Sequence, residues 1–296
     1  MFKTKKLDSD KVFGFFNSIF LIIITALIVY PIYFILIASI SDPNAVAAGQ
    51  TMLLPKGVTF LGYAKILEDA RLVTGFKNSI ILTVWGTSIA MAICLITAFA
   101  LSRKELPGRR FINGFFVFTM YFGGGLIPTY LLHQSLGTMN TYWALILPGL
   151  SVYNMIICRS FFQSNVSEEL FESIKVDGGS YFTFFFKIVL PLSKAIIAVI
   201  VLYTALGFWN NYMTSLYYIQ DSKKWPLQLV LKSITDQIKA NSSEVGASSL
   251  MAMETQKAEQ LTRYSVVIIS SIPVFLLYPF IQKYFVKGVM VGSVKG

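Results

Sequence analysis

Six long apolar stretches constrain this sequence more than any other feature. Each has about the 20 mostly hydrophobic residues that an α-helix needs to cross the hydrocarbon core of a bilayer. The six stretches are roughly 12–40, 78–101, 111–132, 142–162, 195–217 and 264–281. Charged residues make up only 14% of the 296 residues, against about 25% in a typical soluble domain. The sequence therefore predicts an all-α membrane protein with six transmembrane helices.

Two of these predicted spans contain helix-breaking residues. The third contains Gly123-Gly124-Gly125 and then Pro128, so we expect it to be kinked or locally unwound. Pro148-Gly149 interrupts the fourth, which is the weakest candidate for a straight helix. Backbone that is freed at membrane depth must be buried in protein or line a cavity.

Lysine and arginine residues near the span ends predict the orientation, because cytoplasmic loops carry an excess of them. Bases cluster in the N-terminal segment, in the loop 103–110 and after the sixth span, whereas the loop 134–140 has none. Both termini are therefore predicted to be cytoplasmic, with two sizeable external loops at about 41–77 and 221–263. Since the bases lie between apolar runs and are not clustered with aromatic platforms, the net charge of +10 does not indicate a nucleic-acid partner.

The predicted spans lack the residues of most intramembrane chemistry. No acidic, basic or histidine residue lies deep in any span, and the single histidine, His133, lies at the outer end of the third. This argues against a proton-coupled carrier and against an enzyme, although backbone carbonyls can hold sodium without carboxylates. Cys94 and Cys158 are expected to be free apolar thiols. We expect no catalytic residue, metal site or cofactor in this chain, and no phosphate-binding loop is present.

The segment 167–195, between the fourth and fifth spans, is the most informative part of the sequence. Ser167 suits a helix N-cap, and two glutamates follow it in the first turn, where they favour the helix dipole. Gly178-Gly179 should end this helix, because glycine accepts the left-handed conformation of a C-terminal cap. A second helix is expected to start near Ser180 and to meet Pro191. The first helix has an apolar stripe of Leu170, Phe171 and Ile174.

The spacing of this segment resembles the EAA motif of permeases from binding-protein-dependent ABC importers. The matching positions are Glu172, Asp177, Gly178, Gly179, Ile188, Leu190 and Pro191. The two alanines that follow the glutamate in the motif are replaced by Ser173 and Ile174. Trp209-Asn210-Asn211 and the C-terminal residues 288–296 are similar to carbohydrate-type permeases related to the smaller maltose permease subunit. Residues 122–131 resemble a subset serving larger or plant-derived oligosaccharides.

The resemblance implies a type-1 permease fold with its core at about 75–281. Residues 1–74 would hold the N-terminal cytoplasmic segment, the first span and an external loop, and 282–296 a cytoplasmic tail that reaches the ATPase. It also implies a sugar importer of a prokaryotic cell membrane. Its partners would be a homologous second permease, two subunits that bind ATP and Mg, and an external solute-binding protein. The matched motif residues would couple the permease to the ATPase.

Side chains suited to a sugar path are harder to choose. Carbohydrate sites use stacking rings and amide or hydroxyl groups, and the candidates with this chemistry are Tyr153, Asn154, Trp209, Asn210 and Tyr212. Aromatic residues near a membrane interface also serve as anchors, and in relatives the partner permease can supply most sugar contacts. Two other functions stay open from the residues alone: an ion-coupled secondary carrier and a membrane scaffold protein.

Overall fold

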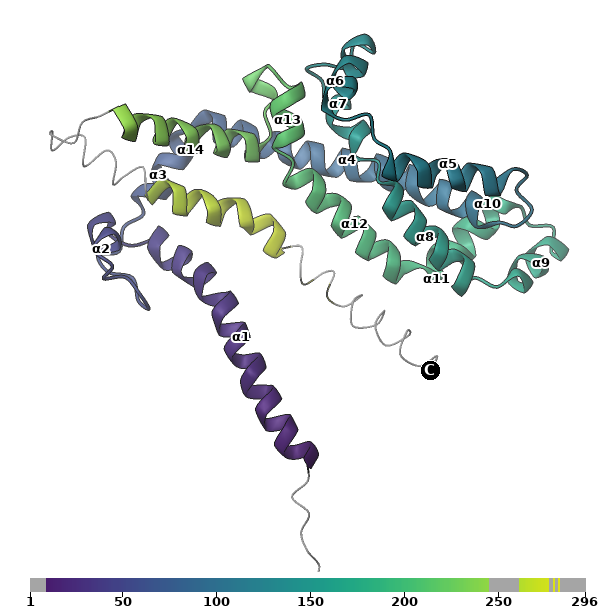
Figure 1. The fold of residues 1–296 in the computed structure, drawn as a ribbon, viewed down its shortest axis with the longest axis horizontal. Helices are drawn as coiled ribbons and strands as arrows, with labels where there is room; N and C mark the ends of the chain where they lie inside the picture. The colour runs from purple at the N-terminus through teal and green to yellow at the C-terminus, as the bar shows by residue number, and fades with distance from the viewer. Residues whose placement is uncertain (1–8, 245–260, 277–278, 280–281, 283–296) are drawn as a thin grey trace, which may run out of the picture. The chain divides into compact units, whose positions relative to one another are not determined.

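The computed structural model describes residues 9–244, 261–276, 279 and 282 of the chain (Figure 1). All regular secondary structure in these residues is helical, as predicted. The predicted tail, 282–296, lies almost wholly outside them, so its contact with an ATPase stays a prediction.

The helices include two that are long and apolar enough to cross a membrane alone, α1 (Ser9–Ser39) and α4 (Ala70–Ser102). Counting each of three bent helix pairs as one span raises that number to five among the described residues. A shorter apolar helix, Leu261–Leu276, overlaps the predicted sixth span. Six crossings and cytoplasmic termini stay predictions. Helix α4 begins eight residues earlier than expected because Arg71 and Lys77 lower the hydropathy of its first turns.

Both predicted helix breaks are present. Helices α5 (Arg109–Tyr121) and α6 (Leu126–Ser135) are separated by the glycine run and meet at 114°, so the third stretch bends far more sharply than a kink. Helix α7 (Trp143–Ile146), the 3₁₀ turn η1 (Leu147–Gly149) and α8 (Val152–Asn165) form the fourth stretch, which bends by 44°.

The segment after α8 contains several short helices. They are α9 (Glu168–Val176), α10 (Tyr181–Phe184), a π-helical turn η2 (Phe185–Val189) and α11 (Leu190–Leu192). Helix α12 (Lys194–Trp209) then leaves at an 82° bend. The predicted fifth span, 195–217, is divided, since its last residues form the separate helix α13 (Met213–Tyr218).

The predicted external loop 221–263 contains regular structure that hydropathy did not reveal. A 3₁₀ turn η3 (Ser222–Lys224) leads into the 18-residue helix α14 (Leu227–Glu244). Its buried residues Leu227, Leu229, Val230 and Leu231 lie in the first turns, and the rest of the helix is mostly polar. An amphipathic helix of this kind has too low an average hydropathy to resemble a membrane span.

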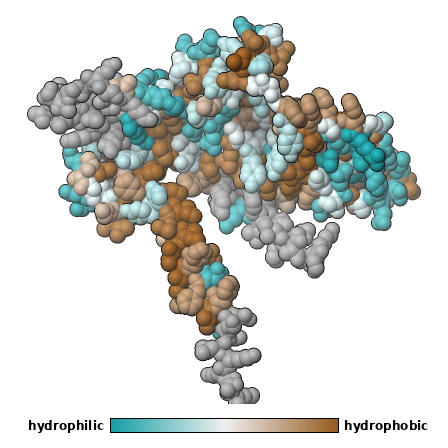
Figure 2. Space-filling view, viewed as in Figure 1, coloured by the Kyte–Doolittle hydropathy of each residue, from teal (hydrophilic) through white to brown (hydrophobic). Residues whose placement is uncertain are grey.

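The chain forms two compact units. The first comprises residues 1–69 and 235–271, and the second 70–234 and 272–296. The first unit holds α1, α2 (Pro43–Ala47) and α3 (Leu61–Glu68). The Ser39 and Tyr63 hydroxyls are 2.8 Å apart, and the rings of Phe34 and Tyr264 make an edge contact at 6.3 Å. Helix α1 exposes apolar side chains from Phe13 to Leu36, which form the brown surface in Figure 2. Such a surface suits lipid.

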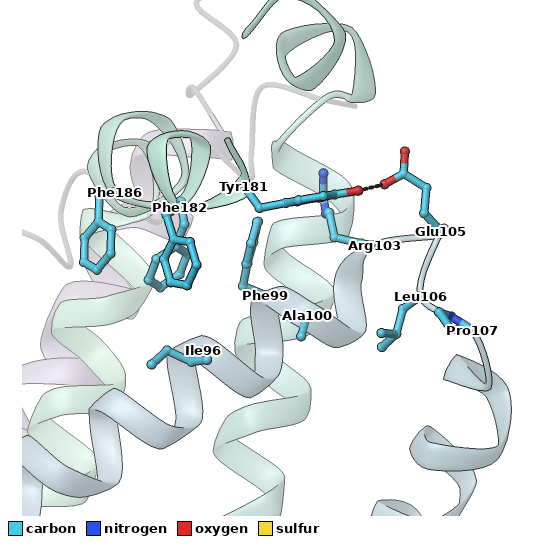
Figure 3. A pocket seen from close by; sticks show the side chains of 11 residues that line it. Ile96, Phe99, Ala100, Arg103, Glu105, Leu106, Pro107, Tyr181, Phe182 and Phe186 are labelled. Carbon is cyan, nitrogen blue, oxygen red and sulfur yellow. Dashed lines mark hydrogen bonds between the residues drawn. The ribbon is translucent and has the colours of Figure 1, made fainter. Parts of the chain in front are cut away.

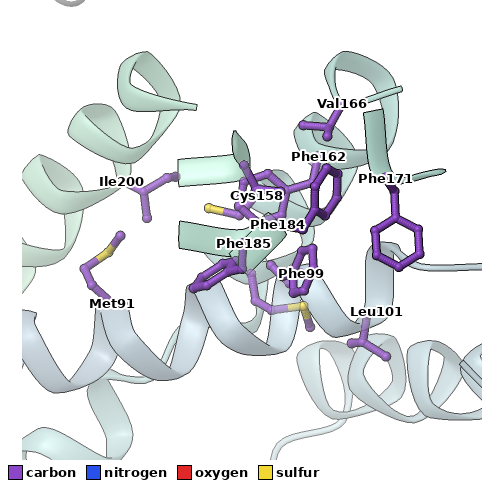
Figure 4. Close-up of a cluster of buried hydrophobic side chains, with 13 residues drawn as sticks. Met91, Phe99, Leu101, Cys158, Phe162, Val166, Phe171, Phe184, Phe185 and Ile200 are labelled. Atoms are coloured by element: carbon purple, nitrogen blue, oxygen red, sulfur yellow. The ribbon is translucent and has the colours of Figure 1, made fainter. Parts of the chain in front are cut away.

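The second unit is built around α4, which packs along α8 and α12. Its main core cluster joins these helices to the short helices of the 167–195 segment (Figure 4). The buried members are Met91, Ala98, Phe99, Leu101, Met155, Cys158, Phe162, Val166, Phe171, Phe184, Phe185, Val189 and Ile200. Both cysteines are free thiols, as predicted.

A second cluster shows how small residues let these helices approach closely. The ring of Phe208 on α12 lies against Gly86 of α4 and Gly149 of η1. A Cβ atom would meet this ring at 2.9 Å from Gly86 and at 2.5 Å from Gly149, so neither position has room for a side chain. Close packing at small residues is the usual way in which membrane helices associate.

Candidate functional site

Helix α9 confirms the first predicted helix of the 167–195 segment. Ser167 occupies the N-cap position with an extended backbone (φ −66°, ψ 151°), although its side chain makes no capping hydrogen bond. Glu168 and Glu169 lie in the first turn and Lys175 in the last. These charges compensate the partial charges at the two helix ends.

The two glycines end α9 in the manner predicted, and each is required for a different reason. Gly178 has φ +75°, and its N–H donates to the carbonyl oxygen of Lys175 at 3.1 Å. The N–H of Gly179 donates to the carbonyl oxygen of Ile174 at 2.8 Å. This pair of bonds is a Schellman motif, which satisfies the last carbonyls of a helix. At Gly179 a Cβ atom would lie 2.4 Å from Ile174 Cγ2 and 3.0 Å from its carbonyl oxygen.

Phe171 fixes α9 to the rest of the protein. It is 3% exposed, and its ring stacks on Tyr181 at 4.6 Å and contacts Phe184 at 5.1 Å. The apolar stripe is therefore divided: Phe171 and the half-buried Ile174 pack inward, whereas Leu170 is exposed. Glu172 is also exposed. The outward face of α9 is thus mainly charged.

The second half of the EAA-type motif has a different role from the first. Ile188, in the π-helical turn, and Leu190 pack against the main core cluster. Pro191 is exposed in α11, and Ser193, at the bend before α12, is fully buried. The motif therefore combines an exposed helix with the packed segment that attaches it to α4, α8 and α12. Asp177 is the exposed C-cap residue of α9.

Sequence reasoning missed a set of contacts between this segment and the loop that follows α4. The ammonium group of Lys104 lies 2.6 Å from a carboxylate oxygen of Glu168. The guanidinium carbon of Arg103 lies 5.5 Å from the ring centroids of both Phe99 and Phe184. The Tyr181 hydroxyl donates to the Glu105 carboxylate (Figure 3). The bases of this loop had indicated only orientation, and no sequence spacing pairs positions 64 or 76 residues apart.

The electrostatics follow these contacts. The hydrogen bond from Lys104 lowers the pKa of Glu168, with smaller contributions from nearby bases. The Tyr181 hydroxyl donates a hydrogen bond to Glu105, and this bond stabilises the protonated phenol. The pKa of Tyr181 is therefore raised. Desolvation lowers the pKa of Arg103, and the charge of Glu168 opposes that effect. At neutral pH the charges in this network are therefore complementary.

A cavity of about 410 Å³ adjoins these contacts (Figure 3). Its walls are mostly apolar and come from the end of α4, the following loop and the residues around α10. The main lining residues are Ile96, Phe99, Leu106, Phe182 and Phe186. Arg103, Glu105 and Tyr181 supply its polar groups.

The five residues considered for a sugar path lie on α8, at the end of α12 and just before α13. Tyr153 is exposed on α8, and the amide of Asn154 donates to the hydroxyl of Thr204 on α12 at 3.3 Å. Trp209 is 5% exposed, and its ring makes an edge contact with Phe76 at 5.8 Å. Asn210 is exposed as the C-cap of α12, and Tyr212 is half-buried before α13. Contact of these residues with a sugar stays a prediction.

The histidine lies in a packed position at the end of α6. His133 is 3% exposed, its Nδ1 lies 2.8 Å from the Thr138 hydroxyl, and its ring lies 4.7 Å from that of Tyr218. No cluster of three or more metal-ligating side chains occurs within the part of the chain that the structure describes.

Comparison with known proteins identifies the family. The family model described as "Binding-protein-dependent transport system inner membrane component" matches residues 109–291, more than half of the chain. The chain belongs to this family. The resemblance drawn from the EAA-type motif is therefore confirmed. As a member, the chain is a multi-pass membrane permease component of an ABC import system.

Individual relatives match this permease over nearly its whole length. The polygalacturonan/rhamnogalacturonan transport system permease protein YtcP of Bacillus subtilis is 40% identical, covering 94% of this chain and 96% of its own. Protein LplC of the same organism is 37% identical over 97% and 96%. A crystal structure of a bacterial ABC transporter involved in the import of the acidic polysaccharide alginate contains a chain with a TM-score of 0.84. The chain in that structure is 30% identical, and the match covers 96% of this permease and 99% of the chain in that structure.

Proposed function

We propose that this permease imports an oligosaccharide, delivered by an external solute-binding protein, and that acidic plant- or alginate-type sugars are its substrate class. The support comes from the two relatives named for transport of polygalacturonan/rhamnogalacturonan and of alginate. Both are acidic polysaccharides. Tyr153, Asn154, Trp209, Asn210 and Tyr212 are the proposed contributions of this chain to the sugar path.

The energy for import comes from partner subunits in this proposal. Two ATP-binding subunits bind ATP and Mg and hydrolyse the nucleotide, and a homologous second permease completes a heterodimer. The family's dependence on a binding protein supports such an assembly. Glu172, Asp177, Gly178 and Gly179 present α9 to one ATP-binding subunit, while Ile188, Leu190 and Pro191 connect it to the spanning helices.

The observation that carries this mechanism is the anchoring of α9. Its outer face is charged and exposed, its end is fixed by two glycines, and Phe171 is buried against Tyr181 and Phe184. A helix held in this way moves with the core cluster that contains Phe171, not independently of it. Closure of the ATP-binding subunits can then bias the spanning helices between inward- and outward-facing states.

The test is uptake by the reconstituted assembly. Proteoliposomes containing both permeases and the ATP-binding subunits, with the binding protein outside and ATP inside, should accumulate labelled trigalacturonate. A neutral galactotriose should be taken up at least several-fold more slowly. Uptake by this chain alone under an ion gradient without ATP would indicate a secondary carrier. Assembly without uptake of either sugar would remove the proposed substrate class.

A further inference from the structure

Three consecutive residues directly after α4 each contact the segment that holds α9. The guanidinium carbon of Arg103 lies 5.5 Å from the ring centroid of Phe99 and 5.5 Å from that of Phe184. Lys104 pairs with Glu168 at the start of α9. Glu105 accepts a hydrogen bond from Tyr181 at the start of α10. The loop thus contacts the first residue of α9 and the first residue of α10.

The position of this loop makes the contacts mechanically relevant. Helix α4 is continuous over 33 residues and packs along both α8 and α12. Along the chain, α9 is connected to α4 through α8 on one side and through α10 and η2 on the other, and Phe171 joins it to the packed core. The contacts of Arg103, Lys104 and Glu105 provide a direct lateral connection from α9 and α10 to the end of α4.

The contacts of this loop contribute little to the stability of the fold. The Lys104 and Glu168 side chains are 74% and 46% exposed, and exposed ion pairs contribute little to folding. The buried ring of Phe171 supplies the attachment of α9. What the loop adds is orientation, because it contacts α9 at Glu168, three residues before Phe171, and also contacts Tyr181, whose ring stacks on Phe171.

We propose that Arg103, Lys104 and Glu105 form a clamp, here called the α4 clamp, that positions α9 so that its movement is transferred to α4. The inference rests on the proposed coupling function of α9. It assigns to these three residues a positioning role in ATP-driven import, in addition to their place in a cytoplasmic loop.

Charge exchange within the clamp tests this role. In the assembled complex in proteoliposomes, Lys104→Glu and Glu168→Lys should each raise the number of ATP molecules hydrolysed per sugar imported by several-fold. The amount of complex recovered should not change. The double variant Lys104→Glu/Glu168→Lys restores the pair in reverse and should return this ratio to within about twofold of the parent.

A neighbouring glutamate supplies the matched control. Glu169→Lys makes the same charge change in the same helical turn, but Glu168 is the partner of Lys104. Adding Lys104→Glu should therefore rescue Glu168→Lys and leave any defect of Glu169→Lys uncorrected. Tyr181→Phe removes only the hydroxyl that bonds Glu105 and keeps the ring against Phe171, so it should raise the ratio more modestly.

The outcomes separate the clamp from the coupling function itself. Parent ratios in both single charge variants, or no recovery in the double variant, would overturn the clamp. If Gly178→Val, which alters α9 directly, is uncoupled in the same preparation, only the clamp is lost. If Gly178→Val and Glu172→Lys both import at the parent rate, the coupling role of α9 fails and the clamp fails with it.

Discussion

The N–H of Gly179 donates to the carbonyl oxygen of Ile174 at 2.8 Å, and the closeness of these two residues leaves no space for a side chain on the glycine. The bond closes the last turn of α9 and sets the direction in which the chain enters α10. Gly178, one residue earlier, supplies the left-handed backbone that the turn needs. The two glycines therefore determine how α9 is presented.

Replacing Gly178 should damage coupling through backbone strain alone. A Cβ atom there would meet nothing within 4 Å, whereas φ is +75°. A β-branched residue in this conformation costs roughly 1–2 kcal/mol, so Gly178→Val should distort the end of α9 and reduce ATP-driven uptake several-fold. Gly178→Asn is the matched control, because asparagine tolerates the left-handed region. Equal loss in both variants would show that strain is not the cause.

Replacing Gly179 should reduce uptake because a new side chain would collide with Ile174. The new Cβ of Gly179→Ala would meet Ile174 at 2.4 Å from Cγ2 and 3.0 Å from the carbonyl oxygen. The end of α9 must shift, and uptake should fall although the complex assembles. Ile174→Leu removes the β-branch methyl and should partly restore uptake to Gly179→Ala. Unchanged uptake in Gly179→Ala alone would contradict the close approach.

Removing the ring of Phe171 should loosen α9 from the core. Truncating a buried phenylalanine costs about 3–5 kcal/mol, and Phe171 is 3% exposed. In purified permease, Phe171→Ala should lower the thermal unfolding midpoint and speed protease cleavage around α9. Leu170→Ala, at the neighbouring exposed position, is the control and should change neither. Equal protease resistance of the two variants would place the attachment of α9 elsewhere.

The predicted orientation can be tested with three exposed serines. Cysteines at Ser135 and Ser222 should react with an impermeant thiol reagent added outside intact cells, and one at Ser164 only after the membrane is opened. Each change from serine to cysteine is small and each side chain is exposed. The assay should use a background with Cys94 and Cys158 replaced. Labelling of Ser164→Cys from outside would reverse the topology and place α9 away from any ATPase.

The sequence predicted those features that depend on local chemistry. Apolar length located the long helices α1 and α4. Gly123-Gly124-Gly125 and Pro148 located the breaks, because these residues act on the backbone where they stand. The motif spacing located α9 and its glycine end. Helix α14 was missed because an amphipathic helix has too low a mean hydropathy to resemble a span.

The features that could not be predicted depend on pairs of residues far apart in the chain. The apolar stripe did not indicate what Phe171 contacts, and the structure shows that Tyr181 and Phe184 fold back onto it and bury it. Likewise the loop charges were interpreted only through membrane topology. Their pairing with Glu168 and Tyr181 requires the helices α4 and α8 to be packed side by side, which no local pattern specifies.

The central claim is that α9 transmits ATP-driven movement to the import pathway, and Glu172 tests it most directly. Glu172 is exposed on α9 in the position of the motif glutamate. The decisive measurement is ATP-dependent sugar uptake by proteoliposomes that contain the complete complex with Glu172→Lys or Gly178→Val. The account predicts that both variants insert into the membrane while uptake falls at least several-fold below the parent rate. Uptake at the parent rate in both variants would contradict it.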